Sequence, residues 1–545
     1  MKLNKGCTFF TGRQVSVAKR GMVTSPHSIA SGVGLDILKK GGSAVDAAIA
    51  TSATLSVIYP HMTGIGGDAF WLIYDSKNNS VNFLNGGGRA AASSNIDYFK
   101  KNSLKVIPNH GIIPGSLTTP GSVDSWCKAH EAFGKLKFNQ IFESAIYYAK
   151  NGIPVTQKLS NWIKKFEKSL NANPFSASIF LKNGVPETGD LIFNPNLGKT
   201  LHQISINGRS GFYDGPVAKE MCRFVEENGG FFNEDDLRSQ NSSWSNPIVG
   251  KYNDLKVYHT PPPTQGFTLI EMLNLLEPLK LKNYKLLSPD LIHLMIQAKQ
   301  IAYNDRDKFL GDPSFSKIPI EKLISKLYAK KRSELIDPIN LLAWDKVPSY
   351  GSLKGDTVYI AVTDEDGNGV SLIHSIYGPF GSTLIAGDTG VLLQNRGAYF
   401  SLEPNHPNSL MPGKIPSHTL TASIGTKNDR LWSLIGCMGA DGQPQIQLQI
   451  YISLLDHHLN IQEAIEIPRW LSGRFSLGEP RDTLHMENRF ENETILELKK
   501  RGHKINLWPE WHETAGHAHG IIYDYRKKIF FGGSDPRSDG AAVGF

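Results

Sequence analysis

Cysteine is scarce in this sequence of 545 residues, and no two cysteines are spaced as a pair. The four that occur, Cys7, Cys127, Cys222 and Cys437, lie far apart and form no C-x-x-C motif. In a chain of this size that pattern argues against a disulfide framework. We expect buried or incidental thiols in a reducing compartment.

Long apolar runs and dense basic blocks are also missing. No segment has the continuous apolar run that a membrane span needs, and charged residues interrupt the first twenty residues throughout. A cytoplasmic location without a membrane partner is therefore our default expectation. The net charge is +7, but Lys and Arg are scattered among acidic residues, which argues against nucleic acid as the main partner.

Several catalytic and metal-binding motifs are absent or incomplete. There is no G-x-S-x-G elbow, and GVGLDI and GIGGDA each lack the third glycine of a dinucleotide loop. In WHETAGHAHG the zinc spacing H-E-x-x-H fails at Gly516, so we expect a solvated or supporting loop. DEDGNG resembles half a calcium loop, but the closing Glu is replaced by Ser375, and a hairpin turn explains the segment better. We expect neither a metal nor a cofactor.

The patterns that are present predict alternating helical and strand-rich regions. Apolar spacing predicts a helix within 25–42 and a second helix from the N-cap Ser43, with Asp46 three residues on. Strands are expected at 70–74 and 80–84, and a mostly helical middle section over about 155–350. After Gly355 the chain becomes strand-rich: further strands are expected at TGVLLQN, TLTASI and RLWSLIGCMG, and one helix at QIQLQIYISLLDHHLNIQEAIEI. Helical layers on either side of antiparallel strands predict a layered α/β sandwich.

The segment GDTVYIAVTDEDGNGVS predicts a β-hairpin that begins at Thr357, directly after Asp356. Within an intact chain a threonine hydroxyl is a poor nucleophile, because nothing removes its proton. Cleavage between Asp356 and Thr357 would give the residue its own base, a new α-amino group with a pKa of about 7.7–8.0. Without further observations, an ordinary strand threonine is the simpler interpretation.

Ordered motifs along nearly the whole chain resemble the γ-glutamyltransferase family of N-terminal nucleophile hydrolases. They include TGIGGDAFWLIYD, NGGGRA, TPGSVDSW, PPPTQG, GDTVYIAVTDEDGNGVS and PSHTL. The resemblance implies an α+β fold, a four-layer αββα sandwich built from one precursor. It also implies cleavage into a large piece, 1–356, and a small piece, 357–545, which stay associated; the oligomeric state, including a dimer of such units, stays open.

The resemblance assigns roles to individual positions. Thr357 matches the nucleophile, and Ser375 matches a hydroxyl residue that orients it. Arg89 matches the arginine that pairs with the substrate carboxylate, a task that suits a planar, permanently charged fork. Ser417 matches a serine that contacts the same carboxylate, and His418 replaces a second serine beside it.

Two further groups of positions bear on catalysis and on the substrate. Gly439 and Ala440 match the pair whose backbone N–H groups form the oxyanion hole. Where typical γ-glutamyl enzymes hold the substrate ammonium with Asn, Gln and Asp, this chain has Tyr377, Arg396 and Tyr399. A cation at this place would repel an ammonium and attract an anion.

We therefore expect a small, carboxylate-bearing amide that lacks the ammonium group. Oxamate amidohydrolase-like members of the family share segments such as MGADGQPQ, PRWLSGR and DPRSDGAA with this chain. The implied reaction is hydrolysis through an acyl-Thr357 ester. Two alternatives remain: a γ-glutamyltransferase or glutathione hydrolase that holds the ammonium with other residues, and an uncleaved, non-catalytic homologue.

Overall fold

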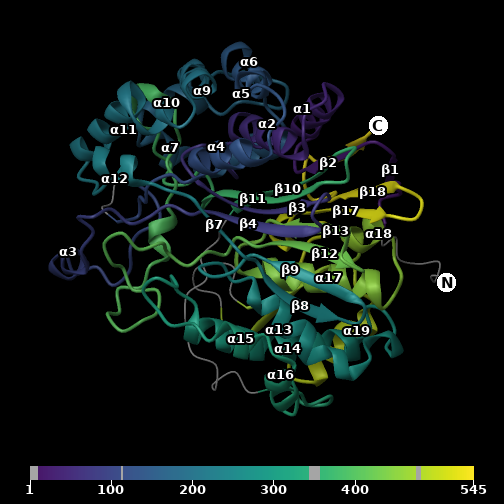
Figure 1. Ribbon diagram of the computed structural model, residues 1–545. Coiled ribbons are helices and arrows are strands. Elements are labelled where there is room, and N and C mark those ends of the chain that lie inside the picture. The colour runs from purple at the N-terminus through teal and green to yellow at the C-terminus, as the bar shows by residue number, and fades with distance from the viewer. Residues whose placement is uncertain (1–9, 112–114, 343–355, 474–479, 481) are drawn as a thin grey trace.

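Two seven-stranded sheets lie face to face between two layers of helices (Figure 1). The structure is a computed structural model that describes residues 10–111, 115–342, 356–473, 480 and 482–545; Cys7 lies outside them. Apolar side chains from both sheets, among them Leu72, Tyr359 and Leu434, fill the space between the sheets. Two larger apolar clusters fill the interfaces between sheets and helices, one cluster for each sheet and its helical layer. The predicted four-layer αββα architecture is confirmed.

The sheet that carries Thr357, called the Thr357 sheet below, has the strand order β19-β2-β10-β11-β3-β4-β7, and all its neighbours are antiparallel. Its strands are β2 (Met22–Ser25), β3 (Asp68–Asp75), β4 (Ser80–Gly86), β7 (Ser243–Ser245), β10 (Asp356–Thr363), β11 (Gly369–Tyr377) and β19 (Ala541–Gly544). The predicted hairpin β10–β11 lies at the centre of this sheet, where both faces are covered.

The second sheet has the order β1-β18-β17-β13-β12-β9-β8. Its strands are β1 (Ser16–Ala18), β8 (Ile248–Tyr252), β9 (Leu255–His259), β12 (Ala422–Lys427), β13 (Arg430–Cys437), β17 (Ala518–Asp524) and β18 (Ile529–Ser534). Each sheet therefore combines strands from before and after Thr357. Pieces cut at that residue would share both sheets and could not separate as independent domains.

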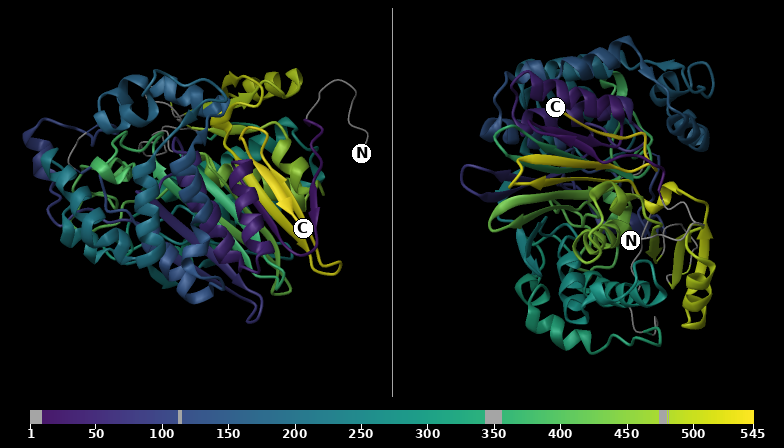
Figure 2. Two further views of the ribbon diagram at one scale, coloured as in Figure 1. Left: turned by 90° about the horizontal axis from the view of Figure 1, so that it is seen from above. Right: turned by 90° about the vertical axis from the view of Figure 1, so that its right-hand side faces the viewer.

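Helices of the N-terminal half cover the outer face of the Thr357 sheet, and later helices cover the second sheet (Figure 2). The first layer includes α1 (Ser28–Lys39), α2 (Ala44–Ile58), α4 (Ser122–Phe133), α6 (Glu143–Asn151), α7 (Gln157–Asn171), α9 (Pro195–Asn207) and α11 (Gly215–Glu227). The second includes α13 (Phe267–Leu276), α14 (Pro289–Phe309), α17 (Gln443–Leu455) and α18 (Ile461–Glu466). A small sheet of β14 (Trp470–Ser472), β15 (Thr483–Glu487) and β16 (Lys504–Trp508) lies at the edge with α19 (Asn492–Lys500).

Local hydrogen bonds fix the hairpin turn and the start of α2. Ser43 and Asp46 form the predicted capping box. Asp364 in the β10–β11 turn accepts hydrogen bonds from the N–H groups of Asn368 at 2.9 Å and Ala44 at 3.0 Å. The acidic turn therefore anchors a buried helix, which supports the hairpin interpretation over a calcium loop.

Two secondary-structure predictions were wrong. TGVLLQN forms only isolated bridges at Leu392 and Leu393, because its N–H groups bond to different segments. The helix expected at QIQLQIYISLLDHHLNIQEAIEI is two helices, α17 and α18, separated at His458, whose φ is +56°. The middle section is mostly helical, as predicted, and also contributes β8 and β9 to the edge of the second sheet.

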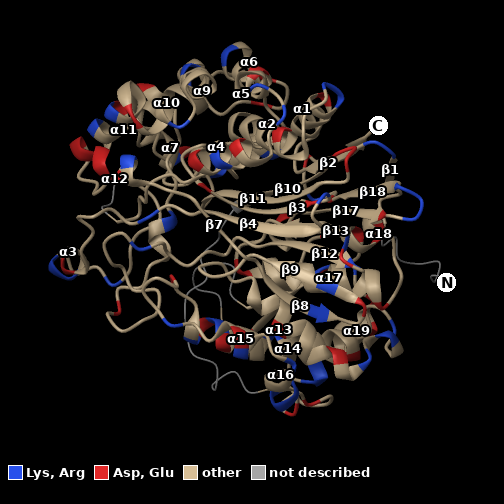
Figure 3. Cartoon of the chain, viewed as in Figure 1, with Lys and Arg blue, Asp and Glu red and all other residues tan. Residues whose placement is uncertain are grey.

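Charged residues of both signs lie mixed along the outer helices and loops, and the strands are mostly uncharged (Figure 3). Burial raises the pKa values of the Cys127 and Cys222 thiols to about 12, in line with the expected inert thiols. Across the part of the chain that is described, no helix combines the length and apolar character needed to cross a membrane.

Candidate active site

The predicted nucleophile lies at an irregular point of the central hairpin. Thr357 is buried, and its Oγ1 donates a hydrogen bond to Ser375 Oγ at 3.3 Å. Ser375 Oγ also accepts the N–H of Tyr377 at 2.8 Å. The β10–β11 register shifts between Asp356 and Val358, so a β-bulge lies at the predicted scissile bond. Of Asp356 the backbone alone is described.

Backbone strain accompanies this bulge. Tyr377, at the end of β11, pairs with Asp356 in the ladder and has a φ of +77°. A bulky residue in the left-handed region costs about 1–3 kcal/mol and persists only where its surroundings enforce it. The strain is therefore concentrated beside the bond that is predicted to break.

Asp68 of β3 extends the row of polar side chains from Thr357 across three neighbouring strands. It lies directly opposite Ser375 in the ladder, and opposite residues of antiparallel strands project to the same face. Its Oδ1 accepts hydrogen bonds from the N–H groups of Gly88 at 2.8 Å and Gly121 at 3.2 Å, and from Gln394 Nε2 at 3.0 Å. Its Oδ2 has no hydrogen-bond partner among the described residues.

Asp68 was not among the residues predicted from the sequence, although one indication was present. An acid that directly follows Gly66–Gly67 heads a strand of apolar residues, so it is buried and must be satisfied there. A Cβ on Gly66 or Gly67 would approach the carbonyl oxygen of Leu392 to 2.2 Å or that of Ser375 to 2.1 Å. These glycines thus allow close backbone packing around the site.

Arg396 and His418 lie beside Asp68, and the rings of Tyr377 and Tyr399 lie against Arg396. The Arg396 guanidinium lies 4.1 Å from the centre of the Tyr377 ring and 6.0 Å from that of Tyr399. Both terminal nitrogens of Arg396, both ring nitrogens of His418 and the Tyr377 hydroxyl are buried without a hydrogen-bond partner within the described chain. Buried polar groups are rarely left unpaired, so this cluster indicates a binding site.

Burial sets the protonation of the cluster. It lowers the pKa of His418 well below its usual value, and the nearby Arg396 charge lowers it further. Burial raises the pKa of Asp68 to about 7, against the opposing effects of the Gln394 hydrogen bond and the Arg396 charge. His418 Nε2 lies 3.7 Å from Asp68 Oδ2. At neutral pH the arginine is thus the one fixed positive charge among these three groups.

Arg89 and Ser417, the predicted carboxylate contacts, come from loops that adjoin each other. Arg89 is half-buried, and its Nη1 donates to the Gly413 carbonyl at 3.2 Å. Ser417 is buried; its Oγ donates to the Leu310 carbonyl at 3.3 Å, and its N–H donates to Asn408 Oδ1 at 2.8 Å. A backbone bond from Ala90 to the Lys414 carbonyl holds the two loops together.

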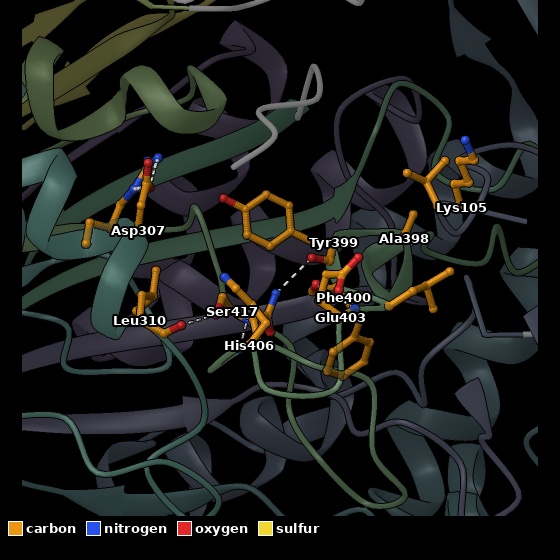
Figure 4. Close-up of a pocket in the computed structure, with 14 residues that line it drawn as sticks. Lys105, Asp307, Leu310, Ala398, Tyr399, Phe400, Glu403, His406 and Ser417 are labelled. Atoms are coloured by element: carbon orange, nitrogen blue, oxygen red, sulfur yellow. Dashed lines mark hydrogen bonds and ion pairs between the residues drawn. The ribbon is translucent and has the colours of Figure 1, made fainter. Parts of the chain in front are cut away.

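Ser417 and Tyr399 also line a cavity of about 260 Å³ (Figure 4). Its wall includes Leu310, Phe400, Asn408 and, from the end of α14, Asp307. The cavity combines an apolar surface with a few convergent polar groups, the usual composition of a small-molecule site. It offers space beyond the cluster around Arg396 for a further part of a ligand.

The predicted oxyanion pair lies at the end of the hairpin where Thr357 is. Gly369, at the turn end, packs on Leu431 and Leu434 of β13, and Tyr359 packs on Gly436, so β13 runs toward Thr357. Gly439 and Ala440 follow β13, with φ values of +146° and +48°. No acceptor within the described residues takes either N–H. The two donors are therefore available for a developing negative charge.

The backbone of Ala440 is strained in this geometry, because its φ of +48° is in the left-handed region. We expect Ala440→Gly to stabilise the protein by about 1 kcal/mol and to leave turnover within about twofold, because the N–H is retained. Chemical denaturation and steady-state kinetics measure the two effects. A large loss of activity would show that the Ala440 methyl group itself is needed.

Gln265, from the PPPTQG segment, connects the parts of the site. Its Nε2 donates to the carbonyls of Thr419 at 3.0 Å and Ala440 at 3.3 Å, and its Oε1 accepts from Arg306 Nη1 at 2.9 Å. Arg306 pairs in turn with Asp441, to which the Tyr399 hydroxyl donates at 3.1 Å. The sequence alone gives Gln265 no role, because its partners are remote in the sequence.

The PRW and DPR segments contribute charged side chains to the buried core. Arg469, Asp535, Arg537 and Glu487 form a buried ion network in which Arg537 bonds to both carboxylates. Arg469 also donates to the carbonyl of Gly516 at 2.7 Å and so holds the WHETAGHAHG loop.

Of the two interpretations of that loop, solvated or supporting, the burial of His517 and His519 favours the supporting one. Among the described residues no group of three or more His, Cys, Asp or Glu side chains is arranged to hold a metal ion.

Comparisons with known proteins agree on one family. The family model described as Gamma-glutamyltranspeptidase matches residues 30–545. The chain is 40% identical to the glutathione hydrolase-like YwrD proenzyme of Bacillus subtilis, over 97% of this chain and 99% of that protein. It is 33% identical to the oxamate amidohydrolase proenzyme of Klebsiella pneumoniae, with the same coverage of both chains. The crystal structure of a cephalosporin acylase from Bacillus halodurans superposes with a TM-score of 0.90 at 32% identity, covering 100% of this chain and 99% of that one.

Proposed function

The chain belongs to the gamma-glutamyltranspeptidase family and is an N-terminal nucleophile amidohydrolase, and from this premise we propose that it hydrolyses a small, carboxylate-bearing amide resembling oxamate. It first cuts its own chain between Asp356 and Thr357. The family relatives named above as proenzymes support this order of events. The two pieces stay together because they share both sheets.

Self-cleavage begins at Thr357 Oγ1. The oxygen attacks the Asp356 carbonyl carbon, the peptide C–N bond breaks, and the acyl group moves from nitrogen to oxygen. Water then hydrolyses the ester, releasing the Asp356 carboxylate and the Thr357 α-amino group. The hydrogen bond between Thr357 and Ser375 orients the nucleophile, and the irregular, strained ladder at this bond supports cleavage here.

Turnover uses the same oxygen with the new amine as its base. The α-amino group takes the Oγ1 proton, Oγ1 attacks the substrate amide, and the backbone N–H groups of Gly439 and Ala440 stabilise the oxyanion. The ammonium returns the proton to the leaving amine, which breaks the C–N bond and leaves an acyl ester on Thr357. Water hydrolyses this ester; from oxamate the products are oxalate and ammonia.

The observation that carries the substrate proposal is the buried Arg396 guanidinium. Its two terminal nitrogens have no hydrogen-bond partner among the described residues, the guanidinium lies over the Tyr377 ring with the Tyr399 ring nearby, and the adjacent His418 is neutral. A planar fork of this kind matches a carboxylate. Arg89 and Ser417 line the neighbouring loops and can hold a further polar group of the substrate.

One observation favours the second candidate, a glutathione hydrolase. The unpaired Oδ2 of Asp68 could bind a substrate ammonium, replacing the acid that typical family members carry at the position of Tyr399. The name of the B. subtilis relative points in the same direction.

A single preparation tests the proposal. Denaturing electrophoresis should give two bands in place of one at 60.1 kDa, and N-terminal sequencing of the smaller piece should begin at Thr357. The protein should hydrolyse oxamate faster than a γ-glutamyl anilide. The opposite preference would establish the glutathione hydrolase, and one unbroken, inactive chain would establish a non-catalytic homologue.

A further inference from the structure

Asp68, Arg396 and His418 form a buried set whose charges balance when no ligand is present. Arg396 is positive, His418 is neutral, and an ionised Asp68 would supply one negative charge. The three residues come from β3, a short 3₁₀-helix and the loop before β12, and each is at most 1% exposed. A substrate carboxylate added to this set would leave a net negative charge in a water-poor site, which is strongly unfavourable.

We infer that Asp68 determines specificity in the proposed reaction by taking up one proton when a substrate carboxylate binds to Arg396. This inference rests on the proposed function. The proton comes from solvent and forms an O–H bond on Asp68, so the carboxylate enters a site that stays neutral overall. A protonated Asp68 also becomes a hydrogen-bond donor, which an ionised carboxylate cannot be.

The contacts of Asp68 determine which oxygen takes the proton. Oδ1 already accepts three hydrogen bonds, from the N–H groups of Gly88 and Gly121 and from Gln394 Nε2. Oδ2 has no hydrogen-bond partner in the described chain and lies 3.7 Å from His418 Nε2. The proton therefore goes to Oδ2, on the side of His418. Arg396 and His418 are the charged or titratable groups beside this carboxyl within the described chain, and cleavage adds the α-amino group of Thr357 in the same row. Burial raises the pKa of Asp68 to about 7.

Chain cleavage explains how a ligand reaches so buried a set. In the uncut chain Asp356 occupies the ladder position opposite Tyr377, whose ring lies over Arg396. Cleavage detaches Asp356 from Thr357. The substrate acyl carbon must then take the place of the Asp356 carbonyl next to Thr357 Oγ1. In oxamate the carboxylate is bonded directly to this carbon, so it lies toward Tyr377 and Arg396.

The test compares oxamate with oxamide, which differs by having a neutral amide in place of the carboxylate. The ratio of their kcat/KM values cancels the titration of the Thr357 amine, which both substrates share. For the wild-type enzyme we expect the oxamate/oxamide ratio to fall as pH rises above about 7, by up to about tenfold per pH unit. In Asp68→Asn the ratio should be independent of pH, because the amide cannot take up a proton.

Two controls separate this effect from a structural role. Asn retains an oxygen for the three donors to Oδ1, and self-cleavage of Asp68→Asn reports correct folding. Asp364→Asn removes another buried acid with a raised pKa, in the hairpin turn away from the site, and should keep the wild-type profile. A pH-independent ratio in the wild type, or an unchanged profile in Asp68→Asn, overturns the inference. The inference is also overturned if Asp68→Asn loses turnover of the γ-glutamyl anilide alone, because Asp68 would then be the ligand of the substrate ammonium.

If the enzyme hydrolyses neither oxamate nor oxamide, the proposed function fails, and a binding measurement tests Asp68 separately. Oxalate is added to cleaved protein in weak buffer near pH 8, and proton uptake is recorded. Proton uptake by the wild type that exceeds uptake by Asp68→Asn, by up to one proton, supports the inference, because uptake by the Thr357 amine is common to both proteins. Equal uptake by both proteins, or none by either, overturns it.

Discussion

Replacing Thr357 by Ala should leave one chain of 545 residues and 60.1 kDa and lower amide hydrolysis by at least about 10⁴-fold. Both effects follow from one oxygen, because Oγ1 attacks first the Asp356 carbonyl and later the substrate. The fold should survive, since the variant loses only one hydrogen bond, to Ser375 Oγ. Mass spectrometry after prolonged incubation, together with an ammonia-release assay on oxamate, measures both outcomes.

Thr357→Ser is the matched control because it keeps the hydroxyl and removes only a methyl group. We expect slower but complete cleavage into pieces of 356 and 189 residues, and measurable turnover. If Thr357→Ala still appears as two pieces, or if the uncut wild-type chain is fully active, the nucleophile is a different residue.

Replacing Arg396 by Gln should lower kcat/KM for oxamate by about 10²-fold. This factor corresponds to about 3 kcal/mol, the free energy of charge-assisted hydrogen bonds to a buried carboxylate. Gln is the residue that typical γ-glutamyl enzymes have at this position. The ratio of oxamate to γ-glutamyl anilide turnover should therefore fall further than oxamate turnover alone. Self-cleavage should persist, because the hydrogen bond between Thr357 and Ser375 does not involve Arg396.

Arg396→Lys distinguishes the charge from the planar fork. It keeps one cation under the Tyr377 ring but can make only single hydrogen bonds, so we expect part of the oxamate activity to return. Equal activity of the Gln variant and the wild type on oxamate would place the substrate carboxylate elsewhere, with Arg89 as the next candidate.

Local patterns predicted the elements whose stabilising contacts are close in the sequence. The Ser43–Asp46 capping box set the start of α2, and the DG turn set the β10–β11 hairpin, because each depends on hydrogen bonds across a few residues. The break between α17 and α18 could have been found in the same way. Asn460 and Glu463 form a second capping box that marks a new helix start.

Elsewhere the sequence did not predict the structure, because the contacts that determine it are made by residues remote in the sequence. TGVLLQN has strand-like residues, but Gln394 bonds to Gly66, Leu393 to Leu384 and Asn395 to Ile376, so no regular ladder forms. The sequence left open whether the loop WHETAGHAHG is solvated or supporting, because its enclosing partners are remote. Arg469 holds the loop, and His517 and His519 are buried.

The order of motifs along the chain carried the resemblance to the family, and that resemblance implied the four-layer architecture and the residues proposed for catalysis. Only the tertiary structure placed Asp68 in the row with Thr357 and Ser375, and left its free oxygen facing His418, 350 positions later. It also made Gln265 the link between Ala440 and Arg306. Whether a buried polar atom is paired depends on every segment packed around it, and those segments meet only in the folded chain.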